Sequence, residues 1–252
     1  MRAAPRTSLA VALLALGTGS SAAAQGGPPL RTDEPGTPGP GHWEVNTAVT
    51  IERIQGQTAF EAPLADVNYG VGERIQLKVE MPLELIVGSG RRLDTGLGNP
   101  LIGVKWRFAE DTASGFAIST YPQLELVSPA RTDAARLERG GDALLLPVEV
   151  TGRWGELDLN AEVGYQLVAH TSGEIIYALA VGRELSARLG LAAECHATSD
   201  ARLAERTTVC SVGGREMVGE HFTLLGAVGR GVGGPRAERP SLAAYLGLQT
   251  VW

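Results

Sequence analysis

Beyond its first 25 residues, the chain contains nothing approaching the roughly 18 consecutive apolar residues of a transmembrane helix. Helical spans are therefore not expected, and any crossing of a bilayer has to be made by strands. Basic residues are also in deficit, because 22 lysines and arginines stand against 28 aspartates and glutamates, for a formal net charge of −6. A nucleic acid is therefore not an expected partner.

Catalytic motifs are missing as well. The sequence has neither a G-x-S-x-G nucleophile elbow nor an H-E-x-x-H metal motif. The four histidines fall on or next to different predicted strands, and none accompanies a serine and an acid in a triad arrangement. His196 and Glu194 share one strand face, but two ligands are too few for a metal site. We therefore expect no enzyme, no catalytic residue, no metal and no cofactor. An envelope enzyme assembled from separate strands is the less favoured alternative.

The N-terminus has the form of a secretory signal peptide. Arg2 and Arg6 precede an apolar centre at residues 9–16, and the small residues Ala22 and Ala24 follow. This pattern predicts a signal peptide over residues 1–24, and the apolar centre is too short for a membrane anchor. The mature chain is therefore expected to be exported, with a charge more negative still.

Residues 26–42 read GGPPLRTDEPGTPGPGH and are too rich in proline and glycine to form a packed element. We interpret residues 25–41 as a periplasmic leader before the first strand. A second arrangement places this segment in the lumen of a barrel, where Arg31, Asp33 and Glu34 would meet lumen charges.

The remaining chain alternates between apolar and polar residues. In IQLKVEMPLEL, residues 75–85, every odd position is apolar, and Lys78, Glu80 and Glu84 take even positions. Side chains of a strand point alternately to opposite faces, so this stretch has one apolar and one charged face. Twelve such segments are predicted: 42–54, 58–69, 73–87, 100–109, 115–127, 142–152, 156–169, 174–185, 188–198, 206–215, 220–230 and 241–252.

The connections between these segments fall into two classes, tight turns alternating with mostly longer loops such as 88–99 and 128–141. Bacterial outer-membrane barrels sort their connections in this way. Aromatic residues at the strand ends on the short-turn side fit the girdle of such a barrel: Trp43, Tyr69, Trp106, Phe108, Phe116, Trp154, Phe222 and Trp252. We therefore predict an all-β fold for residues 42–252, a single antiparallel up-and-down barrel of twelve strands in the outer membrane of a Gram-negative bacterium.

In this barrel the apolar faces meet lipid and the charged faces line the lumen. The final LAAYLGLQTVW resembles the terminal signal read by the outer-membrane insertion machinery, which is therefore an expected partner along with lipid. Cys195 and Cys210 lie on consecutive strands, so the pair can form a disulfide or remain two small apolar residues. The candidate lumen-lining residues are Glu44, Asp66, Lys78, Glu80, Glu84, Lys105, Arg107, Glu125, Glu149, Asp158, Glu162 and Glu194.

Several long strings also suggest a family. PLRTDEPGTPGPGHWEVN, LADVNYGVGERIQLKVEMP and GLGNPLIGVKWRF are joined by AISTYPQLEL, LLLPVEV, LNAEVGYQLV and EHFTLLGAVGRG. Together they resemble a family of outer-membrane barrels named for the meta-pathway of phenol degradation and often labelled transporters. The resemblance implies an outer-membrane channel for small solutes, with small aromatic or hydrophobic compounds as the suggested class. It assigns no binding residue.

Lumen charges of both signs leave two functions open. They can pair into a sealed structural barrel or line a selective pore. Acids predominate among the candidates, so an open pore is expected to prefer cations weakly, with Lys105 and Arg107 as a local basic constriction.

Overall fold

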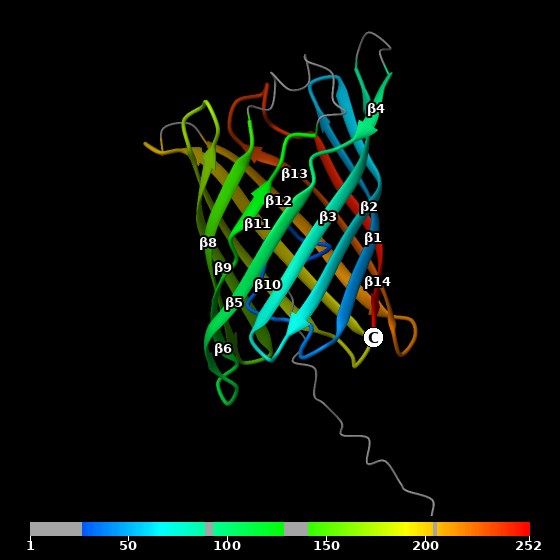
Figure 1. Ribbon diagram of the computed structural model, residues 1–252, viewed down its shortest axis with the longest axis vertical. Coiled ribbons are helices and arrows are strands. Elements are labelled where there is room, and N and C mark those ends of the chain that lie inside the picture. The colour runs from blue at the N-terminus through cyan, green and yellow to red at the C-terminus, as the bar shows by residue number, and fades with distance from the viewer. Residues whose placement is uncertain (1–26, 89–92, 129–140, 204–205) are drawn as a thin grey trace, which may run out of the picture.

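The computed structural model describes residues 27–88, 93–128, 141–203 and 206–252. They form one antiparallel sheet (Figure 1). Among them, no helix is long and apolar enough to span a membrane. The strands are β1 (Trp43–Ile54), β2 (Gln57–Val71), β3 (Ile75–Val87), β4 (Leu93–Leu97), β5 (Leu101–Asp111), β6 (Phe116–Thr120), β7 (Gln123–Glu125), β8 (Ala143–Trp154), β9 (Leu157–Val168), β10 (Glu174–Glu184), β11 (Leu189–Asp200), β12 (Arg206–Met217), β13 (Phe222–Gly233) and β14 (Leu242–Val251).

Two interrupted strands account for the difference between fourteen segments and a twelve-stranded barrel. β4 and β5 both pair with β3, and β6 and β7 both pair with β5 and β8. Proline lies at each interruption, Pro100 before β5 and Pro122 before β7, and proline has no N–H for the ladder. The predicted all-β, twelve-stranded closed barrel is confirmed. The loop expected at 88–99 is shorter than predicted, because β4 lies within it.

The barrel closes between its first and last strands. β1 pairs with β14 from Glu44 opposite Val251 to Arg53 opposite Leu242. At the rim, the Trp43 N–H donates to the Trp252 carbonyl at 2.9 Å, and the Trp252 N–H donates back at 3.1 Å. An even number of strands therefore brings the start of β1 and the end of β14 to one rim.

The outer face of the barrel is apolar. On β3, Val79 is 51% exposed, whereas Gln76, three residues earlier and on the opposite face, is 8% exposed. Leu77, Met81 and Leu83 are exposed like Val79. Their exposure to solvent would be unfavourable over so wide a surface, but it suits contact with lipid.

Aromatic side chains gather at the rim where the chain closes. The rings of Trp43 and Tyr69 lie 4.6 Å apart, and those of Trp106 and Phe108 lie 5.6 Å apart. Phe116, Trp154, Phe222 and Trp252 are exposed at the same ends of their strands. Because connections at this rim are short, the turns and the aromatics mark the same side of the barrel, as outer-membrane barrels do. The opposite rim has one tight exception, the Gln55–Gly56 turn of the β1–β2 hairpin.

Cys195 on β11 and Cys210 on β12 lie directly opposite each other and form a disulfide. Cys195 shares its cross-strand row with Leu179 of β10, which is 61% exposed on the outer face. The disulfide therefore lies on the outer surface and does not line the lumen.

Candidate functional site in the barrel lumen

The lumen contains the part of the chain that precedes β1. Residues 27–41, here called the lumen segment, form no strand, and Leu30, Thr32 and Pro35 within it are buried (Figure 1). Its prolines cannot donate to a ladder, so side chains of the wall satisfy its backbone instead. This is the second of the two arrangements that the sequence left open, and it differs from a flexible leader outside the barrel.

Two wall carboxylates accept hydrogen bonds from the backbone of the lumen segment. The Glu194 carboxylate on β11 accepts from the Arg31 N–H at 3.0 Å, from the Thr32 N–H at 2.8 Å and from the Thr32 hydroxyl at 2.7 Å. Glu162 on β9 accepts from the Asp33 N–H at 3.1 Å. Hydrogen bonds to ionised acceptors are about twice as strong as neutral ones, so these contacts fix the segment against one side of the wall.

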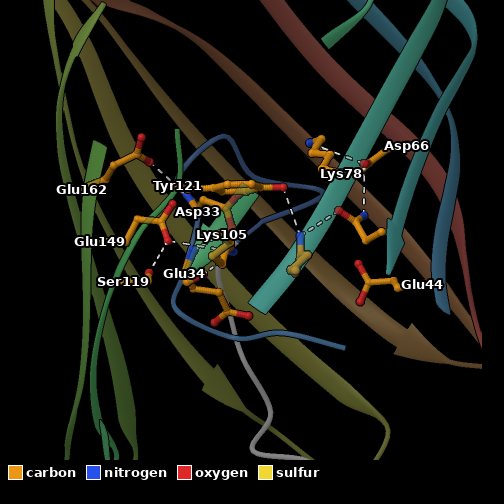
Figure 2. A network of polar contacts seen from close by, with 12 residues as sticks. Asp33, Glu34, Glu44, Asp66, Lys78, Lys105, Ser119, Tyr121, Glu149 and Glu162 are labelled. Atoms are coloured by element: carbon orange, nitrogen blue, oxygen red, sulfur yellow. Dashed lines mark hydrogen bonds and ion pairs between the residues drawn. The ribbon is translucent and has the colours of Figure 1, made fainter. Parts of the chain in front are cut away.

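Lys105 on β5 also holds the segment. Its ammonium donates to Asp33 Oδ1 at 2.6 Å and to the Glu34 carbonyl at 2.5 Å, and it lies 3.9 Å from Glu149 on β8. Figure 2 shows Asp33 and Lys105 pointing toward each other beside the Tyr121 ring. Burial acts to raise the pKa of Asp33, but the ammonium groups of Lys105 and Lys78 outweigh it and hold that pKa below its ordinary value. Asp33 is therefore held as a carboxylate.

A second polar network surrounds Lys78 on β3. Its ammonium lies 2.9 Å from Glu80 and 3.5 Å from Asp66 of β2. Tyr121 connects the two networks, because its hydroxyl oxygen accepts a hydrogen bond from Gln76 at 3.1 Å (Figure 2). The remaining contacts run along neighbouring strands, from Gln76 to Asn68, from Asn68 and Asn46 to Asp66, and from Asn46 to Glu44. Together the two networks cross the lumen.

The lumen segment passes β2 at a point where only glycine fits. A Cβ on Gly70 would lie 1.7 Å from the Gly39 carbonyl oxygen. The Gly41 N–H donates to the Gly70 carbonyl at 2.9 Å, and the Thr37 hydroxyl donates to the Glu73 carbonyl at 3.1 Å. These contacts guide the segment out of the lumen and into β1.

Eight of the candidate lumen residues meet in these networks: Glu44, Asp66, Lys78, Glu80, Lys105, Glu149, Glu162 and Glu194. The others lie apart from them. Arg107 donates to the Glu73 carbonyl at 2.6 Å, Asp158 accepts from Arg153 at 2.9 Å, Glu125 accepts from Asn99 at 2.6 Å, and Glu84 is buried on β3. The local basic constriction expected at Lys105 and Arg107 stays a prediction; in the structure each of the two basic groups has separate partners.

Several residues of the site are uncharged and were not singled out from the sequence. Tyr121, Ser119 and Asn160 are among the most buried side chains of the described residues. Ser119 donates to Glu149 at 2.5 Å, and Tyr121 lies between Lys105 and Gln76. A search of the inward strand positions for polar residues of any kind would have found Ser119 and Asn160. Tyr121 lies at the interruption before β7, where alternation gives no guidance.

No family model matches the chain, and none of the curated proteins does. Solved structures do match. The chain resembles the COG4313 outer membrane channel from Pseudomonas putida F1, with 10% identity over 90% of this chain and 100% of that one and a TM-score of 0.66. The NanC porin is 9% identical over 82% of this chain and 98% of its own, with a TM-score of 0.59. The KdgM porin is 7% identical with the same coverage and a TM-score of 0.58.

These similarities define the class of fold. The chain has the closed antiparallel fold of an outer-membrane β-barrel, in agreement with its apolar outer face and its aromatic rim. At such low identity the similarity concerns the fold alone. Membership of the phenol meta-pathway family therefore stays a prediction from the sequence.

Proposed function

We propose that the protein is an outer-membrane channel for small solutes, with its narrowest part at the lumen segment. One observation carries the proposal. The lumen is filled by a chain segment outside the strand ladder, whose contacts with the wall include hydrogen bonds and ion pairs of Glu194, Glu162 and Lys105. Such a segment can move without breaking the barrel. The fold similarity to channels and porins supports the same proposal.

Small aromatic or hydrophobic compounds are the finer form of the proposal and come from the family resemblance. Tyr121 supports this form, because its ring lies 4.6 Å from the Lys105 ammonium in the narrow part of the lumen. Carboxylates outnumber ammonium groups there, and Lys105 and Lys78 already have acidic partners. A weak preference for cations is therefore proposed for the ions that pass.

Recording in planar bilayers tests the channel proposal directly. The refolded mature chain should give current steps, and its reversal potential in a KCl gradient should have the sign of cation preference. Arg107→Glu should move that potential further toward cations, because Arg107 touches the Glu73 carbonyl and lies outside the Lys105 network. Lys105 is unsuitable for this purpose, since its removal leaves Asp33 without its ammonium partner. Anion preference in the wild type would contradict the assigned lining.

A sealed structural barrel is the second candidate, and one observation favours it. Thr32, Ser119, Tyr121 and Glu149 have no exposed surface, so the lumen at their level is filled in the described structure. Absence of current from correctly folded protein, together with absence of sugar uptake in liposome swelling, would support the sealed barrel and contradict the channel.

A further inference from the structure

Three neighbouring strands place a cluster of polar side chains behind the lumen segment. Asn160 on β9 pairs with Ala180 on β10, which in turn pairs with Glu194 on β11. In the next inward row, Glu162 pairs with Ala178, and Ala178 pairs with His196. We call these six residues the alanine-floored site. All six are buried.

The two alanines are the small side chains between the polar residues of β9 and those of β11. Neighbouring strands are about 4.8 Å apart, so the side chains of β9 and β11 stand roughly 10 Å apart across the alanines. Polar groups therefore face one another over a floor of methyl groups.

Basic side chains meet the charge of the site only in part, because His196 Nδ1 lies 3.7 Å from the Glu194 carboxylate and the Arg31 guanidinium lies 3.4 Å from His196 Nε2. Within the described part of the chain, neither Glu162 nor Glu194 forms an ion pair with a lysine or an arginine. Their contacts with the lumen segment are N–H and O–H donors from Arg31, Thr32 and Asp33. The segment thus supplies donors but no full positive charge in contact with either carboxylate, and buried carboxylates favour a cation.

Asn160 gives an independent indication that the site takes a ligand. It is 1% exposed, and neither its Oδ1 nor its Nδ2 has a hydrogen-bond partner among the residues that the structure describes. Alternation along β9 puts Asn160 on the same inward face as Glu162, and the rows put it opposite Glu194. An unpartnered amide buried at this point costs about 1–3 kcal/mol unless a polar group reaches it.

We propose that the alanine-floored site binds a small organic cation with several N–H donors, a guanidinium or primary ammonium compound. The inference rests on the proposed channel function, because the solute reaches the site through the lumen. Residues 31–33 occupy the site with their own N–H groups and compete with the solute. Binding of the cation displaces the lumen segment at Thr32 and leaves the ion pair between Lys105 and the Asp33 carboxylate in place.

Calorimetric titration of the folded mature chain in detergent, with agmatine as the probe, tests this proposal. Thr32→Leu removes the hydroxyl donor and overpacks a side chain that has no exposed surface, so it loosens the segment without adding charge. We expect it to bind agmatine about tenfold tighter than the wild type, the effect of losing one charge-assisted competitor bond. Thr37→Leu is the matched control, because the Thr37 hydroxyl bonds the Glu73 carbonyl near the rim, away from the site, and it should bind as the wild type does.

Further variants locate the binding and its chemistry. Glu194→Gln or Glu162→Gln, each combined with Thr32→Leu, should remove the gain. Tetramethylammonium, a cation without N–H donors, should not bind with the same gain. Arg31→Ala provides a milder release if Thr32→Leu fails to fold, because the Arg31 guanidinium contacts Glu52 and His196 and is largely exposed.

The outcomes separate the site from the channel. If the loosened variants do not bind agmatine, or if neither glutamine substitution changes the binding, the proposed site is wrong. The two carboxylates then serve only to hold the segment. Equal binding of tetramethylammonium overturns the donor requirement. Absence of bilayer current in every variant contradicts the channel function, while calorimetry still decides the site.

Discussion

Replacing Lys105 by methionine should release the lumen segment from the wall. Methionine keeps much of the side-chain volume but removes the ammonium that bonds Asp33 and the Glu34 carbonyl. Loss of one partner of a buried ion pair costs about 3–5 kcal/mol. Because the Asp33 side chain keeps 20% of its surface exposed, we reduce this range by about 1 kcal/mol, to about 2–4 kcal/mol. This corresponds to a roughly 30-fold to 1,000-fold increase in the fraction of molecules with the segment detached.

A buried thiol introduced into the segment reports this fraction. Pro35 is fully buried beside Glu34, and the two natural cysteines are joined to each other, so Pro35→Cys introduces a single reactive thiol. A protected thiol reacts only from the opened state, and its rate of modification by a maleimide is therefore proportional to the opened fraction. Modification should accelerate by the factor given above when Lys105→Met is added to Pro35→Cys.

Lys78→Met is the matched control for this experiment. Lys78 is another lumen lysine with two acidic contacts, but its partners Asp66 and Glu80 lie on the wall. Modification of the introduced thiol should change by less than about threefold in this control. An acceleration below threefold in Lys105→Met, or equal accelerations in both variants, would refute the anchoring role of Lys105. Heat-dependent migration in gels verifies that each barrel is folded.

Two further predictions concern the outer face and the rim. Val79→Arg should destabilise the folded barrel by about 2–4 kcal/mol because position 79 faces lipid. Glu80→Arg loses the lumen ion pair with Lys78 and should cost about 1 kcal/mol. Equal folding yields of the two variants in lipid vesicles would contradict the assigned faces. Gly70→Ala, added to Pro35→Cys, should accelerate modification of the introduced thiol, because the Cβ of the new alanine would overlap the Gly39 carbonyl oxygen. Gly226→Ala is the control and should leave the rate unchanged, because a Cβ at that position meets nothing within 4 Å. Unchanged rates in both would show that the segment does not depend on its passage over Gly70.

The barrel was predictable because its main determinant is local. Alternation along 75–85 distinguishes the two faces of β3 without knowledge of any other strand, and a slip of one residue would reverse every side chain. Turn lengths and terminal aromatics then indicate a membrane barrel over a sandwich. The β4 strand was missed because its five residues lie in a glycine-rich stretch of the predicted loop.

The contacts of the site were less predictable because they depend on three-dimensional register. Lys105 and Asp33 are 72 positions apart, and their contact requires a closed barrel and a segment inside it. Composition shows that residues 26–42 form no packed element, but it does not say on which side of the wall they lie. The charges of Glu162 and Glu194 were found from alternation, whereas their role as acceptors for backbone N–H groups depends on where the segment runs.

The outward position of the Cys195–Cys210 disulfide has a chemical consequence. A disulfide is reduced when a thiolate attacks one of its sulfurs, and a thiolate is poorly solvated in hydrocarbon. Cys195 lies midway along β11, in a row with the lipid-facing Leu179. Water-soluble reductants therefore reach this bond slowly while the barrel is in a bilayer and readily once it unfolds. The surrounding lipid, more than the protein, protects the covalent link between β11 and β12.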